Sequence, residues 1–298
     1  MGRLERLRLS GAAPSGRRAI RDLAARHGIR PTKALGQNFL IDPNLARAIA
    51  TSVGAAPGVR VLEIGAGLGS LTVALAEAGA DVLALEFDRN LVPALREALE
   101  GLPQDRVRLE VGDAMRADWP SLLGAGDWRM ASNLPYNIAV PLLLELLATA
   151  PGISRCVVMV QREVADRLVA SPGAEAYGAV SAKIAYRADA TMLRTVPPTV
   201  FWPEPKVGSA LVGLTPHPPR VATPCGPLFR VIDEGFAQRR KTMGNALRRL
   251  GLDATTATTT LAACDVPATA RAETLDLAAF ARLTEALLAS GVDLGDAA

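Results

Sequence analysis

The chain contains few of the residues that build metal sites or disulfide frameworks. Its 298 residues include two histidines and three cysteines, and Cys156, Cys225 and Cys264 show no metal-ligand spacing. We therefore expect no bound metal and no disulfides, as is typical of a reducing compartment. No apolar run approaches the roughly eighteen residues of a membrane-spanning helix. These absences predict a cytoplasmic globular protein that does not use a membrane, which a composition of 49% hydrophobic and 21% charged residues also fits.

Lysine is also scarce, with four residues at positions 33, 183, 206 and 241, so arginine carries most of the positive charge. The net charge is only +3, but the cations gather before residue 34 and again at Arg239, Arg240, Lys241, Arg248 and Arg249. Guanidinium groups suit phosphate binding, although genome composition or a solvated helix face could explain the same pattern. The arginine-rich start could be a transit peptide, but residues 17–28 look more like an ordinary amphipathic helix.

Apolar strands and helices alternate from residue 59, which predicts a doubly wound α/β sheet. The expected strands cover 59–64, 81–87, 107–111, 128–132 and 156–160, and the expected helices cover 70–77, 90–99 and 139–148. Two extended stretches at 190–196 and 209–214 predict a hairpin that adds antiparallel strands to one edge. After a proline-rich linker near 217, helices are expected at 228–250, 256–263 and 277–289. The prediction is a basic N-terminal extension (1–29), an α/β domain (30–217) and a small all-α domain (218–298).

A glycine-rich loop follows the first predicted strand. Gly65, Gly67 and Gly69 allow a tight turn and close approach of a ligand to the backbone, with a helix N-terminus behind it. Glu86 ends the second strand, where a carboxylate can accept both hydroxyls of an adenosine ribose. A nicotinamide dinucleotide is the alternative ligand, but the loop lacks the third glycine of that fingerprint. Asp113 follows the third strand, where it could bind an adenine amine or simply cap a turn.

The segment Asn133-Leu134-Pro135-Tyr136 ends the fourth strand. An amide oxygen and a backbone carbonyl could accept the two N–H bonds of an exocyclic amine and localise its lone pair on nitrogen. An aromatic ring beside them could stack on the base. A turn that merely ends a strand is the alternative interpretation.

A longer ordered set of motifs resembles the ribosomal RNA adenine dimethyltransferases, and among them the small-subunit, kasugamycin-sensitivity type. The set runs from Lys33–Leu40 through the Glu63–Gly69 loop, Glu86, Gly112–Ala114, Ser132–Ile138, Gln161–Ala165, Phe201–Ser209, Phe236–Met243 and Arg271–Leu275. Coverage extends from about residue 30 to 288. The resemblance implies the Rossmann-like fold of the class I S-adenosylmethionine-dependent methyltransferases, followed by a small helical domain that binds RNA or the ribosome.

The resemblance also implies a role for particular residues. The cofactor, S-adenosylmethionine, would be bound by Asn38, Leu40, Gly65, Gly67, Glu86, Asp113 and Asn133. Asn133 and the carbonyl of Leu134 or Pro135 would hold the target amine, Tyr136 would stack on the adenine, and Phe201 would cover the other face of the base. Plain core packing is the alternative for Phe201. Arg162, Arg239, Arg240, Lys241 and Arg248 would contact phosphates.

The implied substrate is a pair of adjacent adenines in the 3′-terminal hairpin of small-subunit (16S) ribosomal RNA, within an immature 30S particle, and the implied enzyme is a monomer. Three other functions remain open. They are a large-subunit (23S) adenine methylase conferring macrolide resistance, a non-catalytic assembly factor that kept the fold, and a nicotinamide-dependent dehydrogenase.

Overall fold

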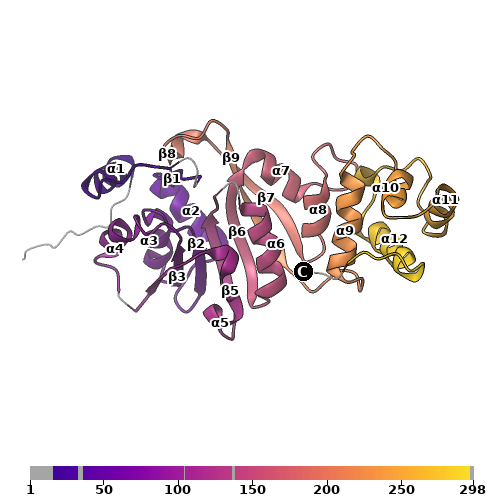
Figure 1. The fold of residues 1–298 in the computed structure, drawn as a ribbon. Helices are drawn as coiled ribbons and strands as arrows, with labels where there is room; N and C mark the ends of the chain where they lie inside the picture. The colour runs from indigo at the N-terminus through magenta and orange to yellow at the C-terminus, as the bar shows by residue number, and fades with distance from the viewer. Residues whose placement is uncertain (1–15, 33–35, 104, 136–137, 296–298) are drawn as a thin grey trace, which may run out of the picture.

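The computed structural model describes residues 16–32, 36–103, 105–135 and 138–295. Seven strands form one sheet in the order β4-β3-β2-β5-β6-β9-β7 (Figure 1). The strands are β2 (Arg60–Ile64), β3 (Asp81–Glu86), β4 (Val107–Val111), β5 (Trp128–Asn133), β6 (Ile153–Gln161), β7 (Ala188–Val196) and β9 (Ser209–Pro216). The first five in the spatial order are parallel, and β9 pairs antiparallel with both β6 and β7. The predicted doubly wound sheet and its antiparallel edge hairpin are confirmed.

Helices cover both faces of this sheet, as the near-continuous apolar runs of its central strands require. Successive residues of β6 alternate between two cores: Val157 and Met159 face one, and Val158 and Val160 face the other. The first core is closed by α2 (Pro43–Val53), α3 (Ser70–Glu77) and Leu95 of α4 (Val92–Leu99). The second is closed by α5 (Trp119–Leu123), α6 (Ala139–Thr149) and α7 (Arg162–Val169). No helix within the described ranges is long and apolar enough to cross a membrane.

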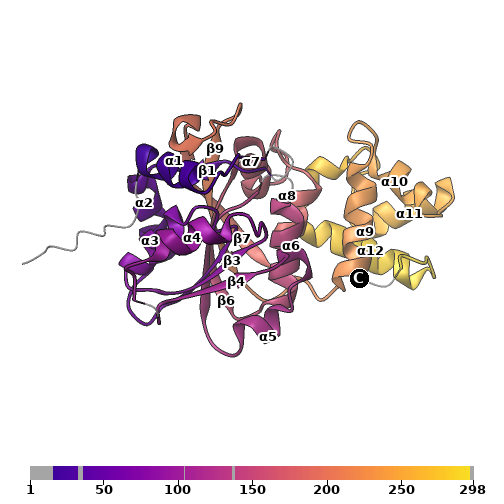
Figure 2. The same cartoon turned by 60° about the vertical axis from the view of Figure 1, so that its left-hand side comes forward.

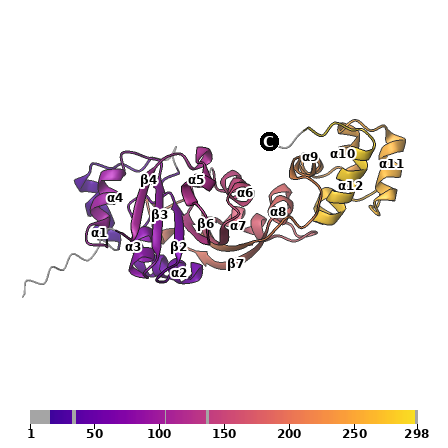
Figure 3. The same ribbon diagram turned by 90° about the horizontal axis from the view of Figure 1, so that it is seen from below.

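The C-terminal helices have a hydrophobic core of their own at one end of the sheet (Figures 1 and 3). They are α9 (Cys225–Phe236), α10 (Met243–Arg249), α11 (Ala254–Ala263) and α12 (Leu277–Ala289). Phe280 of α12 is fully buried in this core. Tyr177, Tyr186 and Ala182, which lies in α8 (Ala179–Ile184), pack into the same core from the other side of the predicted boundary.

The single helix predicted over 228–250 is wrong, because α9 ends at Phe236 and α10 begins only at Met243. Met243 is buried in the helical core, and its backbone N–H donates to the carbonyl of Ala270 at 2.8 Å. Seating this side chain requires the chain to turn through residues 237–242. The basic residues 239–241 therefore lie in a turn and not on a helix.

The predicted N-terminal extension contains a packed helix, α1 (Arg17–Arg26), which lies beside the short strand β1 (Phe39–Leu40) (Figure 2). Ile20 and Leu23 are fully buried, in one cluster with Phe39 and with Leu91 at the start of α4. Strand β1 pairs antiparallel with β8 (Phe201–Trp202) in a separate two-stranded sheet. The basic start of the chain is thus partly a structural element of the α/β region.

Candidate active site

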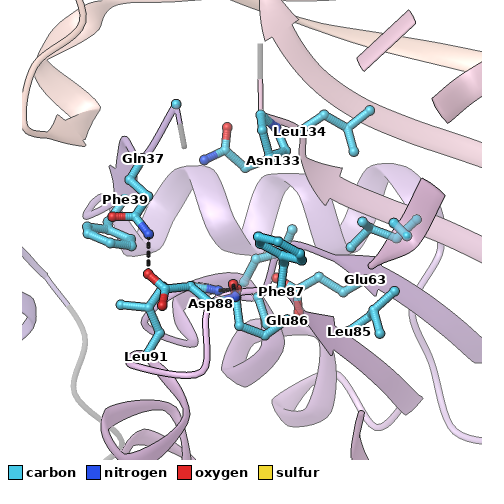
Figure 4. A pocket seen from close by; sticks show the side chains of 18 of the residues that line it. Gln37, Phe39, Glu63, Leu85, Glu86, Phe87, Asp88, Leu91, Asn133 and Leu134 are labelled. Atoms are coloured by element: carbon cyan, nitrogen blue, oxygen red, sulfur yellow. Dashed lines mark hydrogen bonds between the residues drawn. The ribbon is translucent and has the colours of Figure 1, made fainter. Parts of the chain in front are cut away.

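A cavity of about 310 Å³ opens at the carboxyl ends of β2, β3 and β5 (Figure 4). This is where the strand order reverses, the usual ligand position in a doubly wound sheet. All the predicted cofactor-binding residues line it: Asn38, Leu40, Gly65, Gly67, Glu86, Asp113 and Asn133. Leu134 and Pro135 also line the cavity, so the structure brings the predicted cofactor and amine sites together.

The glycine loop forms the floor of this cavity, and two of its glycines are required by close packing. Gly67 and Gly69 both have a positive φ, a conformation that a side chain disfavours. A Cβ at Gly67 would lie 3.1 Å from the ring of Phe39, and one at Gly69 would lie 3.1 Å from Ala98 and Leu95 of α4. Glycine at these two positions therefore lets the loop pack closely against Phe39 and α4.

Glu86 locks the loop to the end of β3. Its Oε2 accepts the N–H of Gly67 at 2.7 Å, and its Oε1 accepts the N–H of Asp88 at 2.8 Å. Burial raises the pKa of Glu86, and these two backbone hydrogen bonds offset part of the rise. Because each carboxylate oxygen can accept a second hydrogen bond, Glu86 can still bind ligand hydroxyls.

The described residues that line the cavity include titratable side chains of one kind only, which are acidic. Its titratable lining residues are Glu63, Glu86, Asp88 and Asp113, and no Lys, Arg or His occurs among the described residues that line it. Carboxylates attract a sulfonium and an ammonium group but repel the pyrophosphate of a dinucleotide. The lining therefore fits S-adenosylmethionine better than a nicotinamide cofactor.

Asp113 has the local capping role that was one of its two expected functions, and it also lines the cavity. Its Oδ1 accepts the N–H of Met115 at 2.9 Å at the start of the short 3-10 helix Ala114–Arg116. Its Oδ2 lies 3.8 Å from Nε of Arg116. This cap fixes the carboxylate at the cavity wall.

Asn133 lies across the cavity from Glu86 and Asp88 (Figure 4). Its Nδ2 donates to the carbonyl of Asn38 at 2.9 Å, and its Oδ1 accepts no hydrogen bond from the residues that the structure describes. Residues 37–40, the entrance segment of the cavity, are also fixed by the Ser70 hydroxyl, which donates to the carbonyl of Leu40 at 2.6 Å. The hydrogen bond between Asn133 and Asn38 thus joins the predicted amine site directly to the predicted cofactor site.

The two backbone carbonyls considered for the amine site differ in their partners. The carbonyl of Pro135 accepts the N–H of Ile138 at 3.2 Å. The carbonyl of Leu134 accepts no hydrogen bond among the described residues, so it is the better acceptor for an incoming amine. Tyr136, the predicted stacking residue, lies outside the described residues, and its role stays a prediction.

The predicted position of Phe201 over the base does not match the structure. Its side chain is fully buried in the core closed by α2 and α3, and it does not line the cavity. The pairing of β8 with β1 turns Phe201 inward, opposite Leu40, while the neighbouring Trp202 packs against Phe39 at 6.0 Å between ring centroids. In this conformation Phe201 supports the entrance segment from behind and does not touch a bound base.

The five predicted phosphate-binding residues differ in how free their charges are. Arg162, the first residue of α7, pairs with Asp166 at 2.8 Å. Arg239 donates to the carbonyls of Glu175 and Tyr177 at 3.1 and 3.3 Å. Arg240, Lys241 and Arg248 are exposed, and their side chains form no hydrogen bond or ion pair within the described part of the chain. The last three are the cations most available to a polyanion.

Three of the cavity residues that the sequence left without a role carry part of the site's structure or charge. Phe87 is 58% exposed despite being a large apolar side chain, and it projects into the cavity next to Glu86 (Figure 4). Asp88 accepts from Nε2 of Gln37 at 2.8 Å and so ties the entrance segment to the end of β3. Glu63 is the third, and its sequence signal was a lone carboxylate within an otherwise apolar strand.

Comparisons with known proteins agree with this geometry. The sequence profile of the family described as "Ribosomal RNA adenine dimethylase" matches residues 29–287. The chain is 45% identical to the Ribosomal RNA small subunit methyltransferase A of Cutibacterium acnes, with 92% of this chain and 94% of that protein covered. It is also 45% identical to the protein of the same name from Thermobifida fusca, with 89% and 93% covered.

Solved structures with the same fold include a dimethyladenosine transferase from Plasmodium falciparum, with a TM-score of 0.73 and 23% identity over 86% of this chain and all of that one. The 23S rRNA methyltransferase ErmE has a TM-score of 0.63 and 23% identity over 84% of this chain and 99% of its own. Both confirm the predicted Rossmann-like methyltransferase fold. The extent of the sequence match shows that this chain belongs to the ribosomal RNA adenine dimethylase family.

Proposed function

We propose that this protein transfers methyl groups from S-adenosylmethionine to the exocyclic amines of adenines in the 3′-terminal hairpin of small-subunit ribosomal RNA, within an immature cytoplasmic 30S particle. The observation that carries this proposal is the orientation of Asn133. Its Nδ2 is held by Asn38, which leaves Oδ1 to accept at the edge of an acidic cavity. The name of the relatives that match most of the chain supports the small subunit as the substrate.

The chain's own residues would supply positioning and dipoles. Gly67, Glu86 and Asp113 hold the cofactor, which supplies an electrophilic methyl group on a sulfonium. Oδ1 of Asn133 and the carbonyl of Leu134 accept the two N–H bonds of the adenine amine and localise its lone pair towards that methyl. Because these acceptors are fixed before the substrate arrives, little reorganisation is needed at the moment of transfer.

We further propose that the helical region 218–298 binds RNA, with the α/β region 30–217 as the catalytic domain. Arg240, Lys241 and Arg248 would contact phosphates directly. Arg162 and Arg239 would do so while keeping their partners, because each guanidinium has donors to spare. Such contacts set the register of the RNA without reading its sequence.

Transfer of labelled methyl groups to isolated ribosomal particles tests this proposal. Immature small subunits that lack adenine dimethylation and, in parallel, large subunits would be incubated with the enzyme and labelled S-adenosylmethionine. Nuclease mapping of the product should give dimethyladenosine in the terminal hairpin of the small-subunit RNA.

Two other outcomes would replace the proposal. Label found only in the large subunit would indicate a 23S methylase, the activity in the name of ErmE, whose fold is similar. No label in either particle, with RNA binding intact, would indicate an assembly factor without catalytic activity.

A further inference from the structure

Two glutamates lie at the carboxyl ends of neighbouring strands in the cavity wall, but only one has backbone hydrogen-bond donors. Glu86 and Glu63 are 5% and 2% exposed. Both oxygens of Glu86 accept backbone N–H groups, whereas Oε2 of Glu63 is buried with no hydrogen-bond partner in the described part of the chain. An ionised carboxylate buried without donors is strongly destabilised. The two side chains therefore differ in the charge that the fold can support.

The groups around Glu63 do not compensate for this burial. Glu86, Asp88 and Asp113 share the cavity with it and are all acidic, and the described lining holds no cation. On the β5 side, Oγ of Ser132 accepts the N–H of Ile64 at 2.9 Å, and no hydrogen bond from this hydroxyl to Glu63 occurs among the described residues. On the α3 side, the hydroxyl of Thr72 is buried and forms no hydrogen bond of normal geometry.

The acidity of Glu63 follows from these surroundings. Burial raises the pKa of Glu63 to about 8, with repulsion from Glu86 adding to the rise and the nearby Thr72 hydroxyl opposing it. At neutral pH the empty site therefore favours the neutral acid.

We propose that Glu63 is the charge acceptor of the cofactor site, protonated when the cavity is empty and ionised when a cationic ligand fills it. The inference rests on the proposed function, since S-adenosylmethionine is the cation expected there. The carboxyl proton of Glu63 leaves to solvent as the ligand enters, and the resulting carboxylate neutralises the positive charge of the ligand. A neutral ligand of the same shape would gain nothing from this exchange.

The source of the positive charge can be one of two groups. S-Adenosylmethionine carries both an ammonium and a sulfonium, whereas its product S-adenosylhomocysteine keeps only the ammonium. Equal proton release with both ligands would assign Glu63 to the ammonium. Release with S-adenosylmethionine alone would assign it to the sulfonium, and Glu63 would then favour substrate over product between successive methylations.

Calorimetric titration of the full-length protein at pH 7 measures the exchange directly. Both ligands would be titrated in phosphate, imidazole and Tris buffers, because the dependence of the binding heat on buffer ionisation gives the number of protons released. We expect close to one proton for the wild type and none for Glu63→Gln. The affinity of the wild type should rise by up to about tenfold per pH unit between about pH 5 and 7, below the range in which the α-amino group of the ligand loses its own proton.

Glu110→Gln is the matched control. It also neutralises a carboxylate of the sheet, but Glu110 lies on β4 outside the cavity lining and pairs with Arg108 at 2.7 Å, so proton release should persist. Circular dichroism would establish that Glu63→Gln, which is nearly isosteric, keeps its fold.

Three results would overturn the inference. Tight binding by the wild type without proton release would show that Glu63 does not change its charge on binding, and it would leave the proposed function standing. Unchanged release in Glu63→Gln would assign the proton to another group. Failure of the wild type to bind either ligand would overturn the proposed cofactor and the inference together.

Discussion

The cofactor cavity and the basic turn at Gln238–Lys241 carry opposite charges in opposite surroundings. In the cavity, Glu63 and Glu86 are almost completely buried, and Glu86 is held by short hydrogen bonds from the backbone. In the turn, the side chains of Arg240 and Lys241 are exposed and have no partner within the described ranges. A buried charge interacts strongly with its few neighbours, whereas an exposed charge is screened by water and salt. The cavity should therefore respond sharply to single substitutions, and the turn weakly and additively.

The largest effect is expected at Asn133, where the acidic cavity meets the amine site. Asn133→Ala removes the fixed Oδ1 acceptor, and we expect the rate of methyl transfer to fall by about 10²–10³-fold. The fold should persist, because the side chain makes one hydrogen bond at the cavity rim. Single-turnover transfer to small subunits is the measurement, with exposed Asn90→Ala as the control. Wild-type turnover by Asn133→Ala would refute the amine clamp.

Glu86→Ala should have the next largest effect, because it leaves the buried N–H of Gly67 and the part-buried N–H of Asp88 without an acceptor. An unsatisfied buried donor costs about 1–3 kcal/mol of unfolding free energy. We also expect the dissociation constant for the cofactor to rise at least about tenfold, which corresponds to roughly 1.4 kcal/mol. Urea denaturation and calorimetry would measure the two effects. Glu110→Ala, at a half-exposed site on β4, serves as the control, and equal losses in both variants would contradict the assigned role.

The pH dependence of stability tests the second buried carboxylate. Since the pKa of Glu63 is about 8 in the folded protein and 4.5 as its ordinary value, the folded state holds a proton that the unfolded state releases. The contribution of Glu63 to the unfolding free energy should therefore fall as pH rises from about 4.5 to 8, and then stay level. Urea denaturation of the ligand-free protein across pH 5–9 should show a shallower decline in Glu63→Gln. Parallel profiles for the two proteins would mean that Glu63 is ionised at neutral pH.

The basic turn should give the smallest effect per residue. Replacing Arg239, Arg240 and Lys241 together with Ala should weaken RNA binding and flatten its salt dependence, by about 0.7–0.9 in log–log slope for each phosphate that the protein no longer neutralises. Arg240→Ala with Lys241→Ala should account for most of this change, because Arg239 is anchored to the carbonyls of Glu175 and Tyr177. Filter binding between 50 and 200 mM salt would measure the slope.

For the salt dependence of RNA binding, the control variant is Arg194→Ala, which removes an exposed arginine on β7. An unchanged slope in the triple variant would remove the turn from the RNA surface.

Elements whose hydrophobic pattern is local were predictable from the sequence. Strand β4 and helices α3 and α12 begin and end where the sequence placed them, because apolar periodicity and capping act within a few residues. The edge hairpin of β7 and β9 was also predicted. Helix α2, the pairing of β1 with β8, and the break between α9 and α10 were not predicted. The break between α9 and α10 depends on how Met243 packs beneath distant helices. Local propensity alone favours a continuous helix through Arg239–Lys241.

The sequence by itself determined the fold class, the family and part of the cavity lining, because glycine spacing, strand-ending carboxylates and Asn133–Pro135 are local features. Only the tertiary structure decided the charge states and the orientations. It showed that Glu86 has backbone donors while Oε2 of Glu63 has no partner among the described residues. It also showed that Phe201 turns into the core and that α1 packs beside the cofactor entrance. The physical reason is that desolvation and hydrogen bonding depend on atoms brought together from distant segments, which the order of residues along the chain does not reveal.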